Sequence, residues 1–446
     1  MPIRKLLLNP WFLKTADLMY RKQVMAWHSF FSQSQWWSRE KLLTYQSDKL
    51  NKLLQISVKE VPFYRNLYNQ HAVDVSEVKT IDDLYRLPIV SKKELKACYP
   101  EGCTRKTNWP VKEYFTSGSS GNPFAVMVDN QTMSQARALM LLRANYSGWQ
   151  QGDAVFQTGM SLQRGVVKKI KDVVFNTYYA SAFDLSDSRL DSYLQVIEQK
   201  KIRYLMGYPG SIFALANRAW QISCNLKMSG VVTWGDNLYE HFRKSIEQQF
   251  QCRVTDTYGC GEGIQVAAQC PDGYNNYHIF MPHVIVEIVD DNGQPIPRGE
   301  LGNILLTRLE PGTMPLIRYK VGDVGRMSVE KACACGRGFD ILEKIVGRDS
   351  DIIHTPNGNK LIVHFFTGIF EYYPQITKFR VYQNKVDELD IQIIFQSDAS
   401  QSVLENIRNE ILKKGDKDLK IKFNLVDEIA DGKNGKRRFV ISDVSR

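Results

Sequence analysis

The chain of 446 residues is too long for one compact core and predicts two or three domains. Its composition, with 43% apolar and 24% charged residues, is that of a folded protein and excludes a disordered one. The net charge of +10 is carried by the two ends, 1–60 and 411–446, so a nucleic-acid-binding function would rest on net charge alone.

The first predicted element, residues 1–31, mixes basic and aromatic side chains such as Arg4, Trp11 and Trp27. This pattern favours a helix packed on its own domain, and it also suits a helix lying on an anionic membrane surface. Residues 1–9 hold only a three-leucine run, far shorter than a secretory signal, and no window approaches a membrane-spanning length of apolar residues. We expect a cytoplasmic protein, and a peripheral contact with the inner face of the membrane through 1–31 stays open.

The rest of the chain divides by periodicity. Residues 1–110 are mainly helical in pattern, and 111–281 alternate β-rich runs with helical stretches. Residues 282–346 are strands separated by turns such as DNG and VGD, and 347–446 mix helices with strands. We therefore predict an α/β fold with a large N-terminal domain, 1–346, followed by a small α+β domain, 347–446.

An unusual run of small residues, TSGSSGNP, occupies positions 116–123. Glycine lets backbone N–H groups approach a ligand closely, so the amides and four hydroxyls of this run could wrap phosphate oxygens. The run is not a Walker loop, because Asn122 and Pro123 follow its second glycine where that motif has Lys and Ser or Thr. By itself the run favours a flexible turn over a phosphate loop.

Later segments supply the context in the order WGDNL (234–238), DTYGCGEG (256–263), IRYKVGD (317–323), GRDSD (347–351) and NGKRRFVIS (434–442). With TSGSSGNP, VPFYRNLY (61–68) and LPIVSKKELK (87–96), they resemble the motifs of the adenylate-forming (ANL) superfamily. The branch they resemble is that of phenylacetate-CoA ligase and the CapK-like proteins of capsular polysaccharide biosynthesis. This resemblance implies an ATP-dependent ligase that activates a carboxylate as an acyl-AMP and passes the acyl group to an acceptor. It also implies that the small domain is mobile about a hinge at GRDSD.

The resemblance also implies site residues. Lys436 and Glu262 take the catalytic roles, and Glu262 holds Mg²⁺, an ion that prefers carboxylate and water ligands. The residues expected to contact ATP or AMP are Thr116, Ser117, Gly118, Ser119, Ser120, Gly121, Gly235, Asp236, Asp256, Thr257, Tyr258, Gly259, Arg318, Asp323 and Arg348.

Residue chemistry leaves alternatives at several of these positions. Glu262 could be a solvated loop acid, and Asp323, expected to accept from both ribose hydroxyls, could be a turn aspartate. Tyr258 could stack on adenine or fill the core, and Arg318 could pair with phosphate or with a neighbouring carboxylate. Lys433 competes with Lys436 for the catalytic role.

The substrate is a small carboxylic or amino acid whose identity the sequence leaves open. The expected pocket residues, with Phe183 as a further candidate, are Gly207, Tyr208, Pro209 and Trp234. The acceptor is either coenzyme A or a sugar amine in surface polysaccharide biosynthesis, and a poor match of the acid-side segments to phenylacetate ligases favours the sugar amine. The remaining alternative, a non-catalytic nucleotide-binding relative, is disfavoured because Glu262, Asp323 and Lys436 occur together.

A second constellation consists of Cys270, His278, Cys333 and Cys335. Thiolates and imidazole are the ligands that Zn²⁺ prefers, and four protein ligands make a structural site rather than a catalytic one. Spacing alone leaves buried free cysteines as an equal alternative. Similar Cys/His and Cys-x-Cys-Gly segments in the phenylacetate-ligase branch favour zinc, whereas we expect Cys260 to serve in packing.

Overall fold

The structure of the protein is a computed structural model that describes residues 17, 23–116, 124–159, 164–182, 184–236, 238, 240–273, 276–346, 353–361, 363–370, 372–373, 375–395, 401–429, 439–442 and 444. The chain divides into two compact units. The first comprises Met1–Tyr114, Ala125–Gly148 and Thr255–Gly347, and the second comprises Phe115–Phe124, Trp149–Val254 and Arg348–Arg446. Both combine sheets with helices, which confirms the predicted α/β fold class, while domain bounds of 1–346 and 347–446 stay a prediction.

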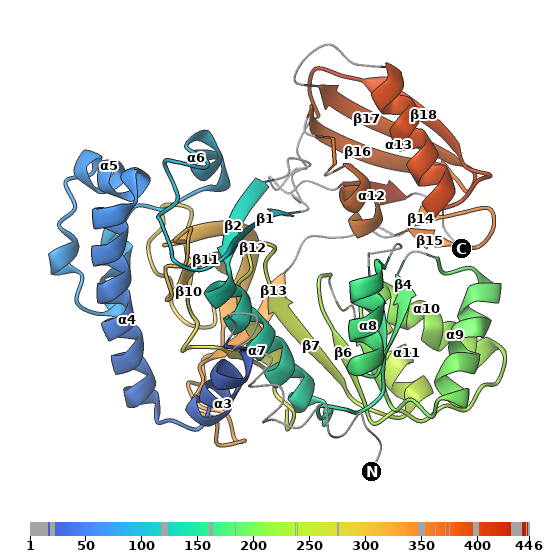
Figure 1. Cartoon of the computed structure of the whole chain (residues 1–446), viewed down its shortest axis with the longest axis horizontal. Helices are drawn as coiled ribbons and strands as arrows, with labels where there is room; N and C mark the ends of the chain where they lie inside the picture. The colour runs from blue at the N-terminus through green and yellow to red at the C-terminus, as the bar shows by residue number, and fades with distance from the viewer. Residues whose placement is uncertain are drawn as a thin grey trace. The chain divides into compact units, whose positions relative to one another are not determined.

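Helices open the first unit (Figure 1). They are α3 (Val24–Ser34), α4 (Arg39–Glu60), α5 (Pro62–Gln70), the 3-10 helices η1 (Val75–Glu77) and η2 (Ile81–Arg86), α6 (Lys92–Ala97) and, later in the chain, α7 (Asn130–Tyr146). The side chain of Ser38 caps α4 by accepting from the Lys41 N–H, and the helix buries Leu42, Leu50 and Leu53 on one face. Helix α4 therefore forms because its apolar stripe has a core to cover.

Helix α3 covers the described part of the basic aromatic segment 1–31. It packs on α7, where the ring of His28 bonds Asn145 Oδ1 at 2.8 Å and the backbone N–H of Gln23 donates to Ser134 Oγ at 3.2 Å. Phe31 is fully buried. These contacts favour packing on its own domain for this part, while 1–16 and 18–22 lie outside the described residues. Within the described residues, no helix is both long and apolar enough to cross a membrane.

The sheet of the first unit is antiparallel. Its strands are β7 (Val254–Gly259), β8 (Gln265–Gln269), β9 (Tyr277–Ile279), β10 (Val284–Val289), β11 (Gly302–Arg308), β12 (Tyr319–Met327) and β13 (Ile341–Val346), in the order β10-β11-β12-β13-β9-β8-β7. Strands β1 (Val111–Thr116) and β2 (Phe124–Asp129) form a separate two-stranded sheet. In the sequence, β1 precedes residues 117–123 and β2 follows them. The loop predicted to bind phosphate thus connects two paired strands.

The central part of the second unit is a parallel sheet in the order β6-β5-β3-β4. Its strands are β3 (Val155–Gly159), β4 (Thr177–Ser181), β5 (Tyr204–Gly207) and β6 (Gly230–Thr233), and its helices are α8 (Val166–Val174), α9 (Asp187–Gln199), α10 (Pro209–Gln221) and α11 (Glu240–Phe250). Parallel neighbours need crossover connections, which these helices supply. Leu205 and Val231 on the strands pack with Leu194, Ile212 and Ile246 on the helices.

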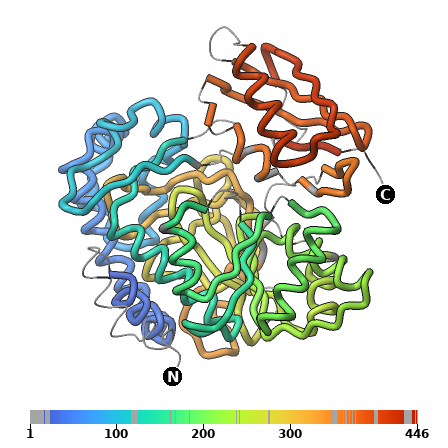
Figure 2. Tube along the Cα trace, turned by 45° about the vertical axis from the view of Figure 1, so that its right-hand side comes forward, coloured from blue at the N-terminus to red at the C-terminus, as the bar shows by residue number. Residues whose placement is uncertain are grey.

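The C-terminal part of the second unit holds a four-stranded sheet in the order β18-β17-β16-β19 (Figures 1 and 2). Its elements are β14 (Ile353–His354), β15 (Lys360–Leu361), α12 (Val363–Phe370), β16 (Ile376–Lys385), β17 (Glu388–Phe395), α13 (Gln401–Lys414), β18 (Lys420–Leu425) and β19 (Val440–Ser442). Phe366 of α12 and Ile407 of α13 are buried in one core with Phe379 and Ile391 of the strands. The two helices therefore pack on the sheet through apolar side chains.

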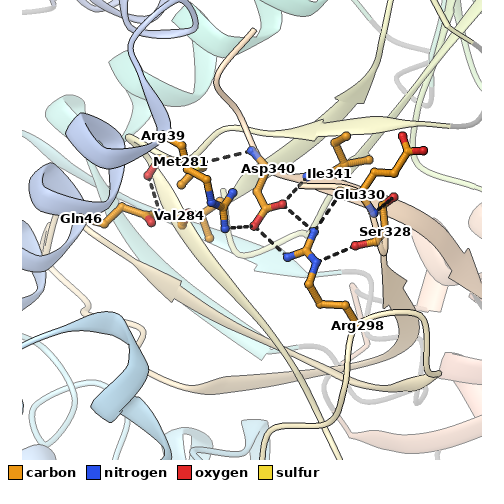
Figure 3. A network of polar contacts seen from close by, with 9 residues as sticks. All are labelled: Arg39, Gln46, Met281, Val284, Arg298, Ser328, Glu330, Asp340 and Ile341. Atoms are coloured by element: carbon orange, nitrogen blue, oxygen red, sulfur yellow. Dashed lines mark hydrogen bonds and ion pairs between the residues drawn. The ribbon is translucent and has the colours of Figure 1, made fainter. Parts of the chain in front are cut away.

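Asp340 joins three segments of the first unit through its carboxylate (Figure 3). Arg298 donates to Oδ1 at 2.8 Å and to Oδ2 at 3.1 Å, and Arg39, at the start of α4, donates to Oδ2 at 2.9 Å. Burial by itself raises the pKa of Asp340, but the hydrogen bonds from Arg298 and Arg39 outweigh it and hold that pKa below its usual value. We call Asp340, Arg39 and Arg298 the Asp340 cluster; it ties α4 and the turn before β11 to the start of β13.

We expect Asp340→Asn to lower the free energy of unfolding by about 2 kcal/mol, because the charge-assisted hydrogen bonds from both arginines are lost. The folded pKa of Asp340 lies below its unfolded value, so this contribution is present at neutral pH and is lost as the pH falls below about 4. Urea unfolding of the wild type and of Asp340→Asn should show that the difference between their free energies of unfolding shrinks at acid pH. The exposed Glu300→Gln is the control; an equal loss in both variants, or a difference that persists at acid pH, would contradict the assignment.

Candidate active site

Part of the predicted site lies outside the described residues: Ser117, Gly118, Ser119, Ser120, Gly121, Phe183, Arg348 and Lys436. Thr116 is the last residue of β1. The roles predicted for these residues stay predictions.

Glu262 lies in the turn between β7 and β8 and is buried, with 4% of its surface exposed. Gly263 gives the turn a φ of +83°, a conformation that glycine adopts without strain. The Tyr319 hydroxyl donates to Glu262 Oε1 at 2.7 Å, and Lys92 Nζ lies 3.4 Å from the same oxygen. Glu262 is therefore a buried, partnered carboxylate and not a solvated loop acid.

The charge on Glu262 is maintained by its neighbours. Burial by itself raises the pKa of Glu262, but the Lys92 ammonium and the hydrogen bonds from Tyr319 and Cys260 outweigh it and lower the pKa below its usual value. The carboxylate is thus ionised at neutral pH, which is the form that binds a divalent cation. Burial and the charge of Glu262 raise the pKa of the Cys260 thiol well above its usual value, so this thiol is a poor nucleophile.

Asp323 on β12 and Tyr258 on β7 meet in the first unit. The Tyr258 hydroxyl donates to Asp323 Oδ2 at 2.8 Å, and both residues are partly exposed. Sequence reasoning assigned these residues separately to ribose and adenine, and the structure brings them together. A partly exposed carboxylate can accept hydrogen bonds from the two hydroxyls of a ribose.

The side chains of Asp256 and Thr257 are used in holding strand β7. Asp256 accepts from the Tyr277 hydroxyl at 2.7 Å, and Thr257 Oγ1 accepts from Arg143 at 3.0 Å. Both are buried, with 7% and 6% of their surface exposed. At Gly259 a Cβ would lie 2.8 Å from the Ile264 carbonyl oxygen, so the strand needs glycine there. These predicted nucleotide contacts therefore lie in a packed strand.

Arg318 has a buried guanidinium that is surrounded by acceptors. It pairs with Glu287 at 3.0 Å and donates to the carbonyl oxygens of Leu87 at 2.5 Å and Gly293 at 2.7 Å. Of the two alternatives that the sequence left open, pairing with a carboxylate is the one seen. A direct contact with ATP would require Arg318 to give up one of these bonds, and its predicted nucleotide role stays a prediction.

In the second unit, the predicted residues follow two neighbouring parallel strands. Gly207 is the last residue of β5, and Tyr208 and Pro209 follow it; Trp234, Gly235 and Asp236 follow β6. Strands β5 and β6 pair so that Gly207 lies opposite Thr233, which places the carboxyl ends of both strands at the same edge. This edge of an open α/β sheet is where ligands commonly bind.

The two glycines at this edge allow close packing around an aromatic pair. A Cβ on Gly207 would lie 1.8 Å from Thr158 Oγ1, and one on Gly235, whose φ is +82°, would lie 2.6 Å from the Tyr208 ring. The ring centroids of Tyr208 and Trp234 are 6.5 Å apart. The edge therefore presents two aromatic rings on tightly packed backbone, which suits an apolar or aromatic ligand.

Cys270, His278, Cys333 and Cys335 come together in the first unit, with their ligand atoms within 4.8 Å of one another. Cys270 Sγ lies 3.7 Å from Cys333 Sγ, and Cys335 Sγ lies 3.3 Å from His278 Nε2. Two thiolates about 2.3 Å from one tetrahedral zinc would be about 3.8 Å apart, so the spacing fits such an ion. Gly336, with a φ of +81°, allows the tight turn behind the two cysteines.

The pKa shifts of His278 and Cys335 favour the ligand forms at the Cys/His cluster, whereas burial raises the pKa of Cys270. Burial, with a smaller effect of Arg337, lowers the pKa of His278 to about 4, so the ring is neutral at neutral pH. Burial raises the pKa of Cys335, but N–H groups of Arg337 outweigh it and lower that pKa below its usual value. A neutral imidazole and a thiolate are the ligand forms that Zn²⁺ needs.

Sequence reasoning missed Lys92 and Tyr319 as partners of Glu262. Lys92 belongs to LPIVSKKELK, which the sequence offered as a family motif; in the structure Ser91 and Glu94 form the capping box that starts α6 there. Tyr319 lies within IRYKVGD, a motif whose predicted site residues were Arg318 and Asp323. The long-range contact with Glu262 depends on how β12 and α6 pack, which a local motif does not reveal.

Comparisons with known proteins decide the family. A family model described as AMP-binding enzyme matches residues 70–315, more than half of the chain. The chain belongs to this family. A second model, described as CapK C-terminal domain, matches residues 353–443. The protein is thus an ATP-dependent adenylate-forming ligase, and enzymes of this kind use ATP and Mg²⁺.

Individual relatives agree with this assignment. Phenylacetate-coenzyme A ligase of Thermus thermophilus is 27% identical over 339 residues, covering 71% of this chain and 72% of that protein. Protein CapK of Staphylococcus aureus is 20% identical over 414 residues, covering 90% of each. A crystal structure of 2-hydroxyisobutyryl-CoA ligase in complex with 2-HIB-AMP and CoA covers 89% of each chain at 19% identity with a TM-score of 0.59, which shows the fold.

Replacing Lys92 should change how this adenylate-forming ligase responds to pH. In Lys92→Gln, the pKa of Glu262 rises because the positive charge that lowers it is gone. We expect the acidic limb of the pH profile of ATP–pyrophosphate exchange to move to higher pH. Lys93→Gln, at the exposed neighbouring position, is the matched control and should keep the wild-type profile; an unmoved acidic limb in Lys92→Gln would refute the coupling.

Proposed function

We propose that this adenylate-forming ligase activates a small carboxylic or amino acid as an acyl-AMP and transfers the acyl group to a sugar amine, forming an amide in surface polysaccharide biosynthesis. The observation that carries the adenylation step is the buried, ionised Glu262 with Lys92 and Tyr319 at its Oε1. The choice of acceptor is supported by the CapK C-terminal domain match and by the CapK relative, which aligns over 90% of the chain.

In adenylation, a carboxylate oxygen of the acid attacks the α-phosphorus of ATP, and pyrophosphate leaves. Negative charge builds on the phosphates, so fixed donors and a metal ion lower the barrier. We assign Mg²⁺ binding to Glu262, with the Lys92 ammonium beside it as a second positive group. We assign ribose binding to Asp323 and phosphate binding to the 116–121 loop, whose small residues leave its N–H groups accessible.

Lys436 is the catalytic lysine of this proposal, supported by its place in the NGKRRFVIS motif. Its ammonium would neutralise charge shared between the acid and the α-phosphate. Because the motif belongs to the C-terminal segment, we infer that a rotation near 347–351 separates the adenylation and transfer steps.

The acid would bind at the carboxyl ends of β5 and β6. Tyr208 and Trp234 supply two rings there, and Gly207 and Gly235 pack too closely to accept larger side chains. Such a pocket suits an acid with an aromatic or apolar body. The second candidate function, an aryl- or acyl-CoA ligase of the phenylacetate type, is supported by phenylacetate-coenzyme A ligases that are 24–27% identical over about 71% of this chain.

The first experiment is acid-dependent ATP–pyrophosphate exchange with a panel of aryl, fatty and amino acids. We expect exchange with one class of acid, reduced at least about 100-fold in Glu262→Ala and in Lys436→Ala, because each removes a charge that stabilises the transition state. Lys433→Ala is the matched control and should keep most of the activity. Measurable ATP binding without exchange for any acid would favour the non-catalytic alternative.

The acceptor is then tested with the acid found, by offering the enzyme coenzyme A or an amino sugar and detecting the thioester or the amide by mass spectrometry. Amide formation supports the polysaccharide role. Rapid thioester formation with no amide would establish the CoA-ligase alternative instead.

We further propose that the Cys/His cluster holds a structural zinc ion. The support is the 3.7 Å spacing of Cys270 and Cys333, the neutral His278 and the tight turn at Gly336. Four protein ligands would close the coordination sphere and leave no position for substrate. The ion would clip the loop between β8 and β9 to the 333–336 turn before β13.

Elemental analysis should therefore find about one zinc per chain, and Cys270→Ser should lower that content and the melting temperature by several degrees. Chelation of the wild-type protein should lower the melting temperature in the same way. Cys252→Ser, at a cysteine outside the cluster, is the matched control; zinc content near zero in freshly purified wild-type protein made with zinc supplied would contradict the site.

A further inference from the structure

Helix α8 of the second unit exposes three of its apolar side chains. Val166, Ile170 and Val173 are 74%, 58% and 60% exposed, and no described side chain of the helix is buried. Positions 166, 170 and 173 project from a helix within an arc of about 60°, so the three side chains form one stripe. The neighbouring α9 shows the usual arrangement, since its apolar residues Leu190, Leu194 and Ile197 are buried.

Lysines border this stripe. Lys169 lies about 40° from Val173, at one edge of the stripe. Lys171 lies about 100° from Ile170 on the other side, beyond Val174, and Lys168 lies on the opposite face. All three lysines are exposed. The acid of the helix, Asp172, forms an ion pair with Arg164. The lysines therefore give the exposed surface of α8 a net positive charge, which reaches the edge of the apolar stripe at Lys169 and flanks it more distantly at Lys171.

The opposite side of α8 fixes its orientation. The Arg164 guanidinium lies 4.0 Å from the centre of the Tyr179 ring on β4 while it pairs with Asp172. The helix also packs beside β4 (Figure 1). The helix is thus held by polar and cation–π contacts from one side, with the apolar stripe on the other.

We propose that α8 is a contact surface for anionic phospholipid membranes. Val166, Ile170 and Val173 would enter the boundary between headgroups and acyl chains, and Lys169 and Lys171 would reach the lipid phosphates on either side. An apolar stripe bordered by lysines on a helix is the arrangement that lies in the membrane interface. A helix of nine residues buries little area, so the binding is weak and reversible.

This surface is made by other residues than those of segment 1–31, and it depends neither on the acid nor on the acceptor of the proposed reaction. An acidic protein partner would also match the lysines. We favour the lipid surface because α8 is short and faces outward, with its exposed apolar side chains and its lysines along the same length of helix. This arrangement suits a flat interface.

The test is flotation of the full chain with vesicles of phosphatidylcholine, with and without phosphatidylglycerol. We expect binding to the anionic vesicles that falls with salt. The variant with Val166→Ser, Ile170→Ser and Val173→Ser should lose binding at least about 10-fold through lost apolar burial. The variant with Lys168→Gln, Lys169→Gln and Lys171→Gln should lose it at least about 10-fold through lost attraction.

Two further variants keep the test decisive. Ile170→Trp should bind anionic vesicles more tightly than the wild type, because tryptophan favours the membrane interface. Trp220→Ser removes an exposed apolar side chain of α10, which is 74% exposed, and should bind as the wild type does. ATP–pyrophosphate exchange without vesicles, equal in all variants, confirms that they are folded.

Unchanged vesicle binding in both triple variants would overturn the proposal and assign any binding to another segment. Lowered melting temperatures with unchanged vesicle binding would also overturn it, because α8 would then be covered by protein. Absence of ATP–pyrophosphate exchange in the wild type would refute the proposed function and leave the vesicle result to be judged separately.

Discussion

The buried carboxylate of Asp340 is the contact on which the first unit depends. Arg39 brings α4 to it and Arg298 brings the turn before β11, while the backbone of Asp340 accepts from the Ile279 N–H at 2.9 Å beside β9. Strand β13 begins at the next residue and pairs with both β9 and β12. The Asp340 cluster therefore determines where β12, which carries Tyr319 and Asp323, lies relative to β9, which carries His278.

The candidate active site uses charge in the same way. A buried Glu262 would be costly without partners, and Lys92 and Tyr319 supply them from α6 and β12. The resulting carboxylate is ionised before any cation arrives, so a divalent ion meets a preformed ligand. Arg318 follows the same rule, since its buried charge is matched by Glu287 and carbonyl oxygens; its task in this structure is to hold the fold.

Helix α8 departs from the rule that orders the other helices. The apolar residues Leu190, Leu194 and Ile197 of α9 are buried, as are Leu42, Leu50 and Leu53 of α4, whereas α8 keeps polar contacts toward β4 and exposes Val166, Ile170 and Val173. These exposed apolar side chains can be removed from water only by contact with another surface, and that contact would lower the free energy. In a chain of the AMP-binding enzyme family, such a surface would bring the enzyme near membrane-bound material without a spanning helix.

The sequence by itself determined the α/β class, the family and the residue types of the site, because these depend on local periodicity and on short ordered motifs such as DTYGCGEG and IRYKVGD. It also grouped Cys270, His278, Cys333 and Cys335 as one candidate zinc site, and the fold brings their ligand atoms within 4.8 Å of one another. Only the tertiary structure decided that Arg318 serves Glu287, that Lys92 and Tyr319 complete Glu262, and that α8 faces outward. The contacts of Arg318 and Glu262 join residues that are far apart in the chain, and the exposure of α8 depends on which helix face is covered. A local sequence pattern holds information on neither.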